Sequence, residues 1–451
     1  MRFNDPAIVW FRQDLRITDQ PALAAGLKHK NLIPLYIWEP SEEGDWPPGA
    51  ASKWWLHDSL ASLDASLAKC GSKLILRRGP TLQALKDVIT ASGATSIYWN
   101  RRYEPAAAQR DKLIQTALES AGIKVETFNG SLLQDPAATL NQSGSPYLVF
   151  GAFWRVQSVK PVGALIDAPS RLPPLPAALS SATLESFSLK PTIPWDGGLR
   201  KMWRIGERPA NAALARFCSN SISGYQESRD LPAESGTSRL SPHLHFGELS
   251  PRQVWTFARN HENAGASTFM KEIMWREFSY YLLHHHPRLA NEPLQAKFKD
   301  FHWESDPVQL EAWKRGLTGF PIVDAGMREL WHTGWMHNRV RMIVASFLVK
   351  DLRIHWLQGA RWFWDTLVDA DLASNSQGWQ WTSGCGADAA PYFRVFNPTL
   401  QEKKFDPDQA YVRRWIPEFG TPSYPAPIVD HGRARFAALR AFDAIGSTSR
   451  K

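Results

Sequence analysis

The sequence predicts a multi-domain chain of the α/β plus α class: a doubly wound, five-stranded parallel sheet, then a long linker, then an all-helical C-terminal half. Short apolar runs alternate with helical stretches up to about residue 130. Beyond about residue 206, apolar residues recur at spacings of three and four, with no strand pattern between them. We therefore expect domains at residues 1–130 and 206–451, joined by a linker at residues 131–205.

Five short apolar runs in the first part are typical of strands. They are Ala7–Phe11, Leu32–Trp38, Lys73–Leu76, Ser96–Trp99 and Lys124–Phe128. Helical spacing fills the gaps between them at Gln20–Lys28, Ser52–Lys69, Thr81–Ser92 and Pro105–Ala121. Ligands of such sheets bind beyond the carboxyl ends of the strands. The chain has no G-x-G-x-x-G and no Walker A sequence, which disfavours dinucleotide or triphosphate binding through those loops.

Periodicity disappears from about residue 131 to 205, where many prolines interrupt a Ser-rich stretch. We expect a mostly irregular connector, parts of which pack on a domain, because structureless loops of this length are unusual. The remaining chain has helical spacing at Ala210–Cys218, Pro251–Arg259, Ser267–His284, Pro307–Arg315, Val323–Trp331, Met336–Lys350 and Gly359–Leu367.

Composition excludes several classes of protein. With 43% hydrophobic and 12% aromatic residues, the 451-residue chain is too apolar to be disordered and too long for one ordinary core. Its 3 cysteines, Cys70, Cys218 and Cys385, lie far apart without a C-x-x-C pair, so we expect no metal site and no disulfide framework. This cysteine usage fits a reducing compartment, and we expect a cytoplasmic protein.

No apolar run is long enough to span a membrane or to serve as a secretory signal. The net charge of +8 permits a polyanionic partner without demonstrating one. The count of 21 tryptophans is abnormal, and it requires either large aromatic clusters or a use for indole beyond packing.

Two motifs in the helical half could bind ligands. The first is Tyr225-Gln-Glu-Ser-Arg229, followed by Gly236-Thr237-Ser238-Arg239-Leu240-Ser241-Pro242, where hydroxyls and main-chain N–H groups entering a helix could bind a phosphate. An ordinary N-cap followed by a loop would look the same. The second is Glu272-Ile-Met-Trp275-Arg276, an acid beside an aromatic ring that could bind and stack a planar ligand. Taken alone, this motif is better explained as a Glu–Arg surface pair beside a core Trp.

Two further motifs are less easily explained by packing. Trp335, Asn338, Arg339 and Met342 have the spacing of one helix face, and burying Asn and Arg there without partners would be costly, so a pocket wall competes evenly with a half-exposed helix. The densest stretch is Asp369-Ala-Asp371-Leu-Ala-Ser-Asn375-Ser-Gln-Gly378-Trp379-Gln-Trp381, then Gly386 to Arg394. Its acid pair is typical of a metal or glycosidase site, but no third ligand follows at a metal-loop spacing.

These four stretches, in this order, resemble the photolyase/cryptochrome family of blue-light flavoproteins. The stretch Trp10-Phe11-Arg12-Gln13-Asp14-Leu15-Arg16 is similar to the family's opening strand, and the resemblance covers nearly the whole chain. It implies an N-terminal α/β antenna-binding domain, a long linker and a helical FAD-binding catalytic domain, in agreement with the periodicity.

The resemblance also implies roles for individual residues. Tyr225 and the run Thr237, Ser238, Arg239, Leu240 and Ser241 would hold the FAD diphosphate and ribityl region, Asp369 and Asp371 would bind the flavin end, and Asn375 would sit at flavin N5. The lesion pocket would comprise Glu272, Trp275, Asn338, Arg339, Met342 and Trp381, with Arg229 and Gln401 approaching the DNA. Trp379, Trp356 and Trp303 would form the electron-transfer chain, in that order from the flavin to the surface.

The activity implied is that of a deoxyribodipyrimidine photolyase, a carbon–carbon lyase acting on cyclobutane pyrimidine dimers in UV-damaged DNA. Excited reduced FAD would donate one electron to a flipped-out dimer and regain it after the ring splits. A protonated Glu272 would donate a hydrogen bond to a thymine carbonyl as negative charge develops. We expect a monomer with no membrane partner.

Several residues favour the repair enzymes over other family members. Plant cryptochromes typically carry Asp where this chain has Asn375, and enzymes for (6-4) lesions use a His pair where it reads His337-Asn338. The chain also lacks the long signalling tail of many cryptochromes. The segments Trp38–Trp46 and Gly49–Trp55 resemble bacterial class III photolyases. The alternative is a blue-light photoreceptor of the cryptochrome type, and a weaker one is a FAD-dependent oxidoreductase.

The antenna chromophore is less clearly indicated. The class III resemblance implies methenyltetrahydrofolate, but Tyr103-Glu104-Pro105-Ala106-Ala107 lacks the Asn-Glu pair that enterobacterial folate-type enzymes carry after the matching Tyr-Glu. A deazaflavin, FMN or no antenna are therefore alternatives.

Overall fold

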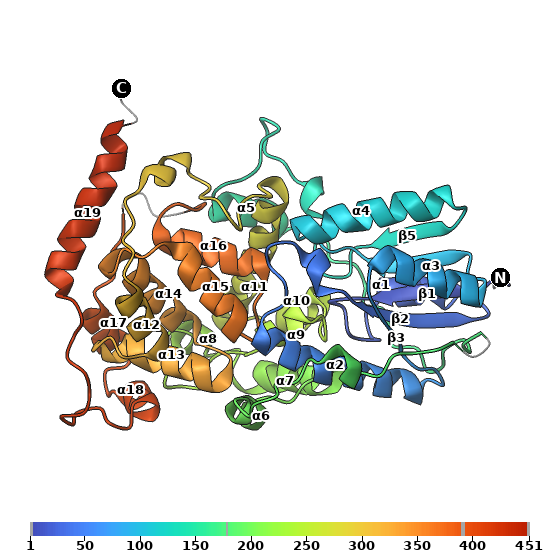
Figure 1. Ribbon diagram of the computed structural model, residues 1–451, viewed down its shortest axis with the longest axis horizontal. Coiled ribbons are helices and arrows are strands. Elements are labelled where there is room, and N and C mark those ends of the chain that lie inside the picture. Colours follow the sequence, from blue (N-terminus) through green and yellow to red (C-terminus); the bar gives the residue numbers. More distant parts are fainter. Residues whose placement is uncertain (1–2, 177–178, 389–392, 449–451) are drawn as a thin grey trace.

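The computed structural model describes residues 3–176, 179–388 and 393–448. It confirms the predicted fold class, with a sheet at one end and helices at the other (Figure 1). All five strands are parallel, in the order β3-β2-β1-β4-β5. Their bounds are β1 Ala7–Phe11, β2 Leu32–Trp38, β3 Ile75–Arg78, β4 Ser96–Asn100 and β5 Lys124–Phe128.

Helices cover both faces of the sheet, because alternate residues of each strand point to opposite sides. Val9 and Phe11 of β1 pack in one apolar cluster with α1 and α2, and Ile8 and Trp10 pack in another with α3 and α4. These helices are α1 Pro21–Gly26, α2 Ala50–Lys69, α3 Thr81–Ser92 and α4 Pro105–Ser120. The third strand begins two residues later than predicted, at Ile75 rather than Lys73.

The opening motif forms a buried junction between the two halves of the chain. Arg12 donates to Asp111 at 2.6 Å, and Arg16 donates to the carbonyls of Gly130 and Gly247, at 2.7 and 2.9 Å. Gly247 has φ +65°, and a Cβ there would lie 2.2 Å from the carbonyl oxygen of Gln13. Because any larger residue would push the helical half away, this junction requires glycine.

The linker packs on both halves, and its described residues include the α-helices α5 Phe150–Gln157 and α6 Gly197–Met202 and two short 3-10 helices. Its side chains Leu172 and Phe187 belong to the apolar cluster of the sheet, and Phe150 and Phe153 belong to the cluster of the helical half. The expectation that parts of it pack on a domain is therefore met. The helix α5 has only eight residues, about two turns, which is too short to show a periodic pattern of apolar residues in the sequence.

A buried carboxylate fixes the start of the linker. Glu277 accepts hydrogen bonds from the main-chain N–H groups of Leu133 and Gln134, at 2.8 and 3.4 Å. Burial raises the pKa of Glu277 from 4.5 to about 7, although Arg276 opposes the shift. Between these two pH values the unfolded chain releases the proton while the folded chain keeps it, so stability falls as the pH rises through this window.

Replacing Glu277 by Gln should remove this loss, because the amide oxygen can accept the same two N–H groups and never ionises. The unfolding midpoint of Glu277→Gln minus that of the unmodified protein should be larger above pH 7 than at pH 4.5. A change of about 1 kcal/mol moves the midpoint by roughly 2–4 °C in domains of about 150–250 residues, and by less in a chain of 451 residues. A difference between the two proteins that does not change with pH would contradict this assignment.

The second half contains only helices in its described residues, apart from one isolated bridge between Glu304 and Ile354. Its helices are α7 Glu207–Asn220, α8 Tyr225–Ser228, α9 Ser241–His245, α10 Pro251–Arg259, α11 Ala264–His285, α12 Pro307–Arg315, α13 Pro321–Thr333, α14 Asn338–Ser346, α15 Trp356–Thr366, α16 Leu372–Ser383, α17 Pro398–Phe405, α18 Ala410–Trp415 and α19 His431–Thr448. No described helix is both long and apolar enough to cross a membrane.

The predicted helix Met336–Lys350 differs from the structure in two ways. Gly334, at φ +68°, ends α13, and the side chain of His337 accepts from the N–H of Arg339 and begins α14. The last part, Phe347–Asp351, is a π-helix. The sequence of α16 does not match an amphipathic pattern because its buried face carries polar residues, such as Ser376 and Gln380, beside apolar ones, such as Leu372 and Trp379.

Candidate functional site

The first predicted motif forms a connected loop at the edge of the helical half. Tyr225 is buried at the start of α8, and burial together with Glu272 raises its pKa above the usual range. Thr237, Ser238 and Arg239 are half-buried and lead into α9 at Ser241. The predicted turn entering a helix is therefore present.

Arg239 is the cation of this loop. Its guanidinium lies 4.9 Å from the ring centre of Trp335 and near the sulfur of Met202, and burial lowers its pKa. Among the described residues it forms no ion pair with a carboxylate. A partly buried guanidinium that no carboxylate contacts directly is suited to an anionic ligand such as a diphosphate, although Glu329 lies near enough to act on its charge.

The two acids of the densest motif are buried and paired. Asp369 accepts two hydrogen bonds from Arg341, at 2.8 and 3.0 Å. Asp371 caps the N-terminus of α16 through the N–H of Ser374 and accepts from the hydroxyl of Tyr280. Burial raises the pKa of Asp371, but His245, Arg276 and Tyr280 outweigh it and hold the pKa below its ordinary value. Asp371 is therefore a fixed acceptor.

These acids do not form a metal site. No group of three His, Cys, Asp or Glu side chains within the described ranges is placed to hold a metal ion. Asn375, one turn further along α16, donates from its Nδ2 to the carbonyl of Ala360 at 3.1 Å, which fixes the orientation of its amide.

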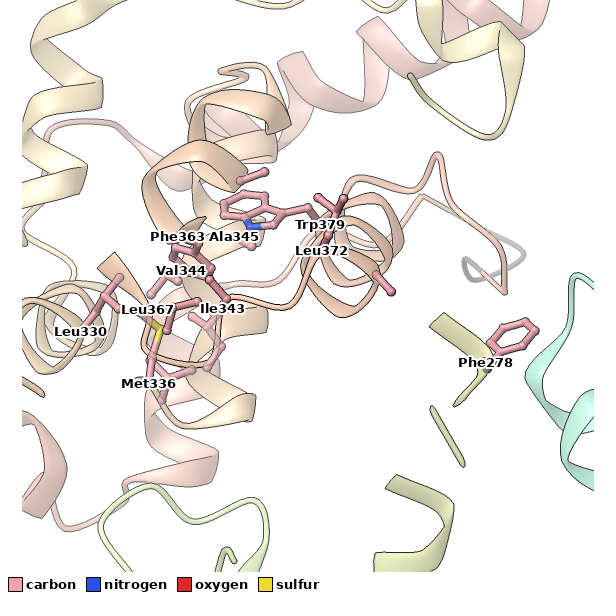
Figure 2. Close-up of a cluster of buried hydrophobic side chains, with 14 of the residues drawn as sticks. Phe278, Leu330, Met336, Ile343, Val344, Ala345, Phe363, Leu367, Leu372 and Trp379 are labelled. Atoms are coloured by element: carbon pink, nitrogen blue, oxygen red, sulfur yellow. The ribbon is translucent and has the colours of Figure 1, made fainter. Parts of the chain in front are cut away.

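Trp379 reaches from α16 to α15, where its ring centre lies 5.0 Å from that of Phe363 (Figure 2). It also lies 6.2 Å from Trp313, a fully buried residue that the sequence reasoning missed. A Cβ on Gly359 would come within 2.1 Å of the indole, so glycine is required for this close approach. The Nε1 of Trp379 is buried without a protein partner.

The other two tryptophans of the predicted chain are connected through a histidine. Trp356 is buried at the start of α15, and its ring lies 5.7 Å from that of His355. His355 in turn lies 5.0 Å from Trp303, which is half-buried and nearer the surface. Trp379 and Trp356 are both buried, at 2% and 1% exposure, and Trp303 is the more exposed residue of the three. The role of these residues in electron transfer stays a prediction.

Glu272 has a different partner from the surface pair that the sequence allowed. The Nη1 of Arg229 donates to its Oε1 at 2.6 Å, whereas Arg276 turns to the carbonyl of Ser131. Burial raises the pKa of Glu272, and Arg229 opposes that shift. Next to this pair, Arg339 donates to both carboxylate oxygens of Asp230, at 2.6 and 3.2 Å. The predicted Glu272, Arg229 and Arg339 therefore lie together.

The two tryptophans predicted to line the lesion pocket are each held by another segment. Trp275 stacks on Phe150 of the linker, with ring centres 3.7 Å apart and 8° between planes. Trp381 donates from its Nε1 to the carbonyl of Asp388 at 3.1 Å. Residues 389–392, which belong to the predicted motif, lie outside the described residues. One face of Trp275 is thus occupied by Phe150, which the sequence did not indicate.

The third motif does not form one helix face, so that prediction is wrong for Trp335. Asn338 and Met342 lie on α14, but Trp335 precedes it, because the glycine turn at Gly334 intervenes. Trp335 is buried beneath Arg239 and Arg341 instead. Asn338 is exposed, and the sulfur of Met342 lies 3.9 Å from Arg339.

Gln401 is half-buried on α17. The guanidinium of Arg339 lies 4.5 Å from the ring centre of Phe405 on the same helix. This contact joins α17 to the group around Glu272, although no direct contact of Gln401 with that group is present among the described residues.

A cavity of about 310 Å³ lies between the carboxyl ends of the strands and the helical half. Its wall includes Trp38, Trp46 and Trp364, and the rings of the last two meet edge to face at 5.4 Å. Glu43 in this wall accepts from Arg102 and Arg110, at 2.8 and 3.0 Å. Burial raises the pKa of Glu43, but the two guanidinium groups outweigh it and lower the pKa overall.

The residues present fit a FAD cofactor. The loop from Thr237 to Ser241 offers hydroxyls and a guanidinium for a diphosphate, and Asp371 and Asn375 offer oriented polar groups for a flavin ring. The unpartnered Nε1 of buried Trp379 marks a polar atom that no protein group satisfies. This donor set is chemically that of a flavin dinucleotide site.

Comparisons with known proteins agree with this site. Residues 269–423 match the model of the FAD binding domain of DNA photolyase, and residues 7–175 match the DNA photolyase model. Deoxyribodipyrimidine photo-lyase of Agrobacterium fabrum is 45% identical over 98% of this chain and 99% of its own. Cryptochrome-1 of Arabidopsis thaliana is 40% identical over 91% of this chain but only 63% of its own.

A solved structure gives the same result. The crystal structure of a bacterial class III photolyase from Agrobacterium tumefaciens superposes with a TM-score of 0.94 at 44% identity, covering 99% of both chains. The fold, the FAD-binding region and the full-length similarity agree, and the chain belongs to the DNA photolyase family, whose members include the cryptochromes.

Proposed function

We propose that the protein uses light to split cyclobutane pyrimidine dimers in UV-damaged DNA. The observation that carries the proposal is the group formed by Glu272, Arg229 and Arg339 on one side of the FAD-binding loop. It combines an acid of raised pKa with fixed cations, as recognition of a polar lesion on a phosphate backbone requires. The repair enzyme of Agrobacterium fabrum, which is similar over its whole length, supports this choice.

Bound FAD would supply the photoexcited electron donor. Tyr225 and the loop from Thr237 to Ser241 would hold its diphosphate and ribityl region, and Asp369 and Asp371 its flavin end. Asn375, oriented by Ala360, would fix the polar edge of the ring. These residues orient the cofactor and exclude water from it.

The lesion pocket would be formed by the remaining predicted residues. Trp275 and Trp381 would provide apolar walls for the extruded bases, and Phe150 would hold Trp275 in its orientation. Asn338 and Met342 would contact the dimer from α14. Arg229, Arg339 and Gln401 would approach the backbone, so affinity should fall steeply with salt. Flipping costs a few kcal/mol, and less for a dimer, whose stacking is already impaired.

We further propose an antenna in the cavity that contains Trp46 and Trp364, with methenyltetrahydrofolate as the chromophore. The ionised Glu43 in its wall would accept from the amino-pyrimidinone part of a pterin, and the indoles would stack against planar rings. The protein would act as a monomer in the cytoplasm. All three described cysteines are free and buried, which supports a reducing compartment.

The decisive experiment measures dimer loss from a UV-irradiated oligonucleotide, using the purified holoprotein with its FAD reduced. We expect dimers to disappear under blue light and to persist in the dark, with undamaged DNA unchanged in both. A photoreceptor would show flavin photoreduction under light while the dimers remain. An oxidoreductase would turn over a small substrate in the dark. Either result would contradict the proposal.

A further inference from the structure

A second hollow, of about 670 Å³, lies on the helical half, and none of the predicted FAD and lesion residues lines it. We call it the Trp331 groove. Its walls come from α12, α13, α15 and α18, and Figure 1 shows α12, α13 and α18 on the side of the molecule far from the sheet. The groove is lined by aromatic and cationic side chains, which are the two components that bind bases and phosphates.

The aromatic part is a pair of parallel indoles. The ring centres of Trp331 and Trp362 lie 6.0 Å apart with 3° between planes, and Trp331 is 62% exposed. A Trp side chain usually stabilises a fold by being buried, but that of Trp331 is largely exposed. Because Trp362 holds its ring in a fixed orientation, the ring offers a flat apolar surface on which another ring can stack. Trp415 closes the groove, and its Nε1 lacks a protein partner.

The cationic part surrounds the indoles. The Nζ of Lys314 lies 5.1 Å from the ring centre of Trp362, and Arg315 beside it forms no ion pair within the described part of the chain. Arg328 is neutralised by Glu418 at 2.7 Å. Arg414 donates to the carbonyl of Ala233 at 3.0 Å, which holds its guanidinium at the rim. Only one of the lining residues, a glutamate, is acidic, so the groove is positive overall.

We propose that the Trp331 groove binds single-stranded DNA, with an unpaired base stacked on Trp331 and the adjacent phosphates near Lys314 and Arg315. Charge complementarity favours an anion, and the open indole face favours a planar ring. A polymer suits this site better than a free nucleotide, because small-molecule sites bury most of their ligand and Trp331 is too exposed for that. The proposal does not depend on lesion repair, since the ligand is an undamaged strand.

The first test is fluorescence anisotropy of a labelled, undamaged oligothymidylate with the holoprotein. Trp331→Ala should weaken binding by roughly fivefold to a hundredfold, the range for losing one base stack, and Trp331→Phe should restore most of it. Phe436→Ala is the matched control, because Phe436 is 61% exposed with the Arg440 guanidinium 5.0 Å from its ring. It should bind normally. Unchanged binding by Trp331→Ala would overturn the proposal.

Salt dependence tests the cations separately. Lys314→Gln should reduce the slope of log Kd against log salt concentration by about 0.7 for a single strand. Lys297→Gln is the control, since the Nζ of Lys297 lies 5.0 Å from Phe442, outside the groove. Thymidine monophosphate should bind far more weakly than the oligonucleotide. Equal affinity of the two would overturn the choice of a strand and indicate a free-nucleotide site.

Cross-linking distinguishes the Trp331 groove from the lesion face. A single strand carrying 5-iododeoxyuridine, irradiated with the holoprotein, should attach to peptides that contain Trp331 or Trp362. Cross-links confined to peptides around Trp275 or Trp381 would overturn the proposal, because single strands would then bind only at the lesion pocket. Dimer repair by Trp331→Ala, measured in parallel on duplex DNA, should equal that of the unmodified protein.

Discussion

Trp379→Phe is expected to reduce photoreduction of oxidised, bound FAD to near zero. Trp379 is 2% exposed, is held against Phe363 at 5.0 Å, and occupies space kept open by Gly359. Phenylalanine would fill most of that space, so the fold should persist, but its ring is far harder to oxidise than indole. Absorbance of the flavin under continuous blue light with an external reductant gives the rate directly.

Dimer repair provides the control, because chemically reduced FAD does not need the tryptophan chain. Trp303→Phe, at the surface end of that chain, should slow photoreduction of oxidised FAD but leave repair by the reduced protein intact. Loss of repair by the reduced Trp303 variant would mean that these tryptophans have been assigned wrongly to an electron-transfer chain. Comparing Trp356→Phe with Trp313→Phe then shows which of these rings receives the charge from Trp379, since Trp313 lies 6.2 Å from it.

Glu272→Ala is expected to weaken binding of dimer-containing DNA and to lower the repair yield, with FAD still bound. A hydrogen bond between neutral groups contributes about 0.5–1.5 kcal/mol, so loss of the protonated donor should lower dimer affinity by roughly twofold to tenfold. The substitution also leaves Arg229 without its partner at 2.6 Å. Binding by electrophoretic shift and repair per absorbed photon are the two measurements.

Glu272→Gln separates the two contributions. Its amide can donate to a thymine carbonyl, as the protonated acid would, but it cannot balance the charge of Arg229. If the donor function dominates, Glu272→Gln should retain most of the repair yield while binding weakens moderately. A yield as low as that of Glu272→Ala would show that the ion pair with Arg229, rather than hydrogen-bond donation, is what the site needs.

The strands were predicted well because each is a short buried run that alternates between two apolar clusters. Ala7–Phe11 and Leu32–Trp38 agree with the structure to the residue. Several helices with one polar face were predicted, as in Pro251–Arg259, but α17, α18 and α19 near the end of the chain were not. The domain boundaries stay a prediction. The helix α16 was not predicted because its buried face mixes polar residues, such as Ser376 and Gln380, with apolar ones, so it has no apolar stripe.

The sequence predicted site residues that lie together in one short motif, but it did not predict the contacts that distant segments make with them. Glu272 and Trp275 stand out in the sequence as an acid beside an indole, but nothing there indicates that Phe150 stacks on Trp275 or that Arg229 pairs with Glu272. Trp335 was misplaced because spacing alone does not reveal the left-handed turn at Gly334. Such contacts depend on tertiary packing, which local periodicity does not encode.

The linker that contributes Phe150 to one core and Phe187 to the other has a consequence for engineering. If the sheet domain is exchanged between family members, the linker will not match the side chains that it packs against in one of the two halves. The linker would have to be exchanged together with the core residues that contact it. Recombination between relatives should therefore yield active hybrids only when the crossover preserves those paired contacts.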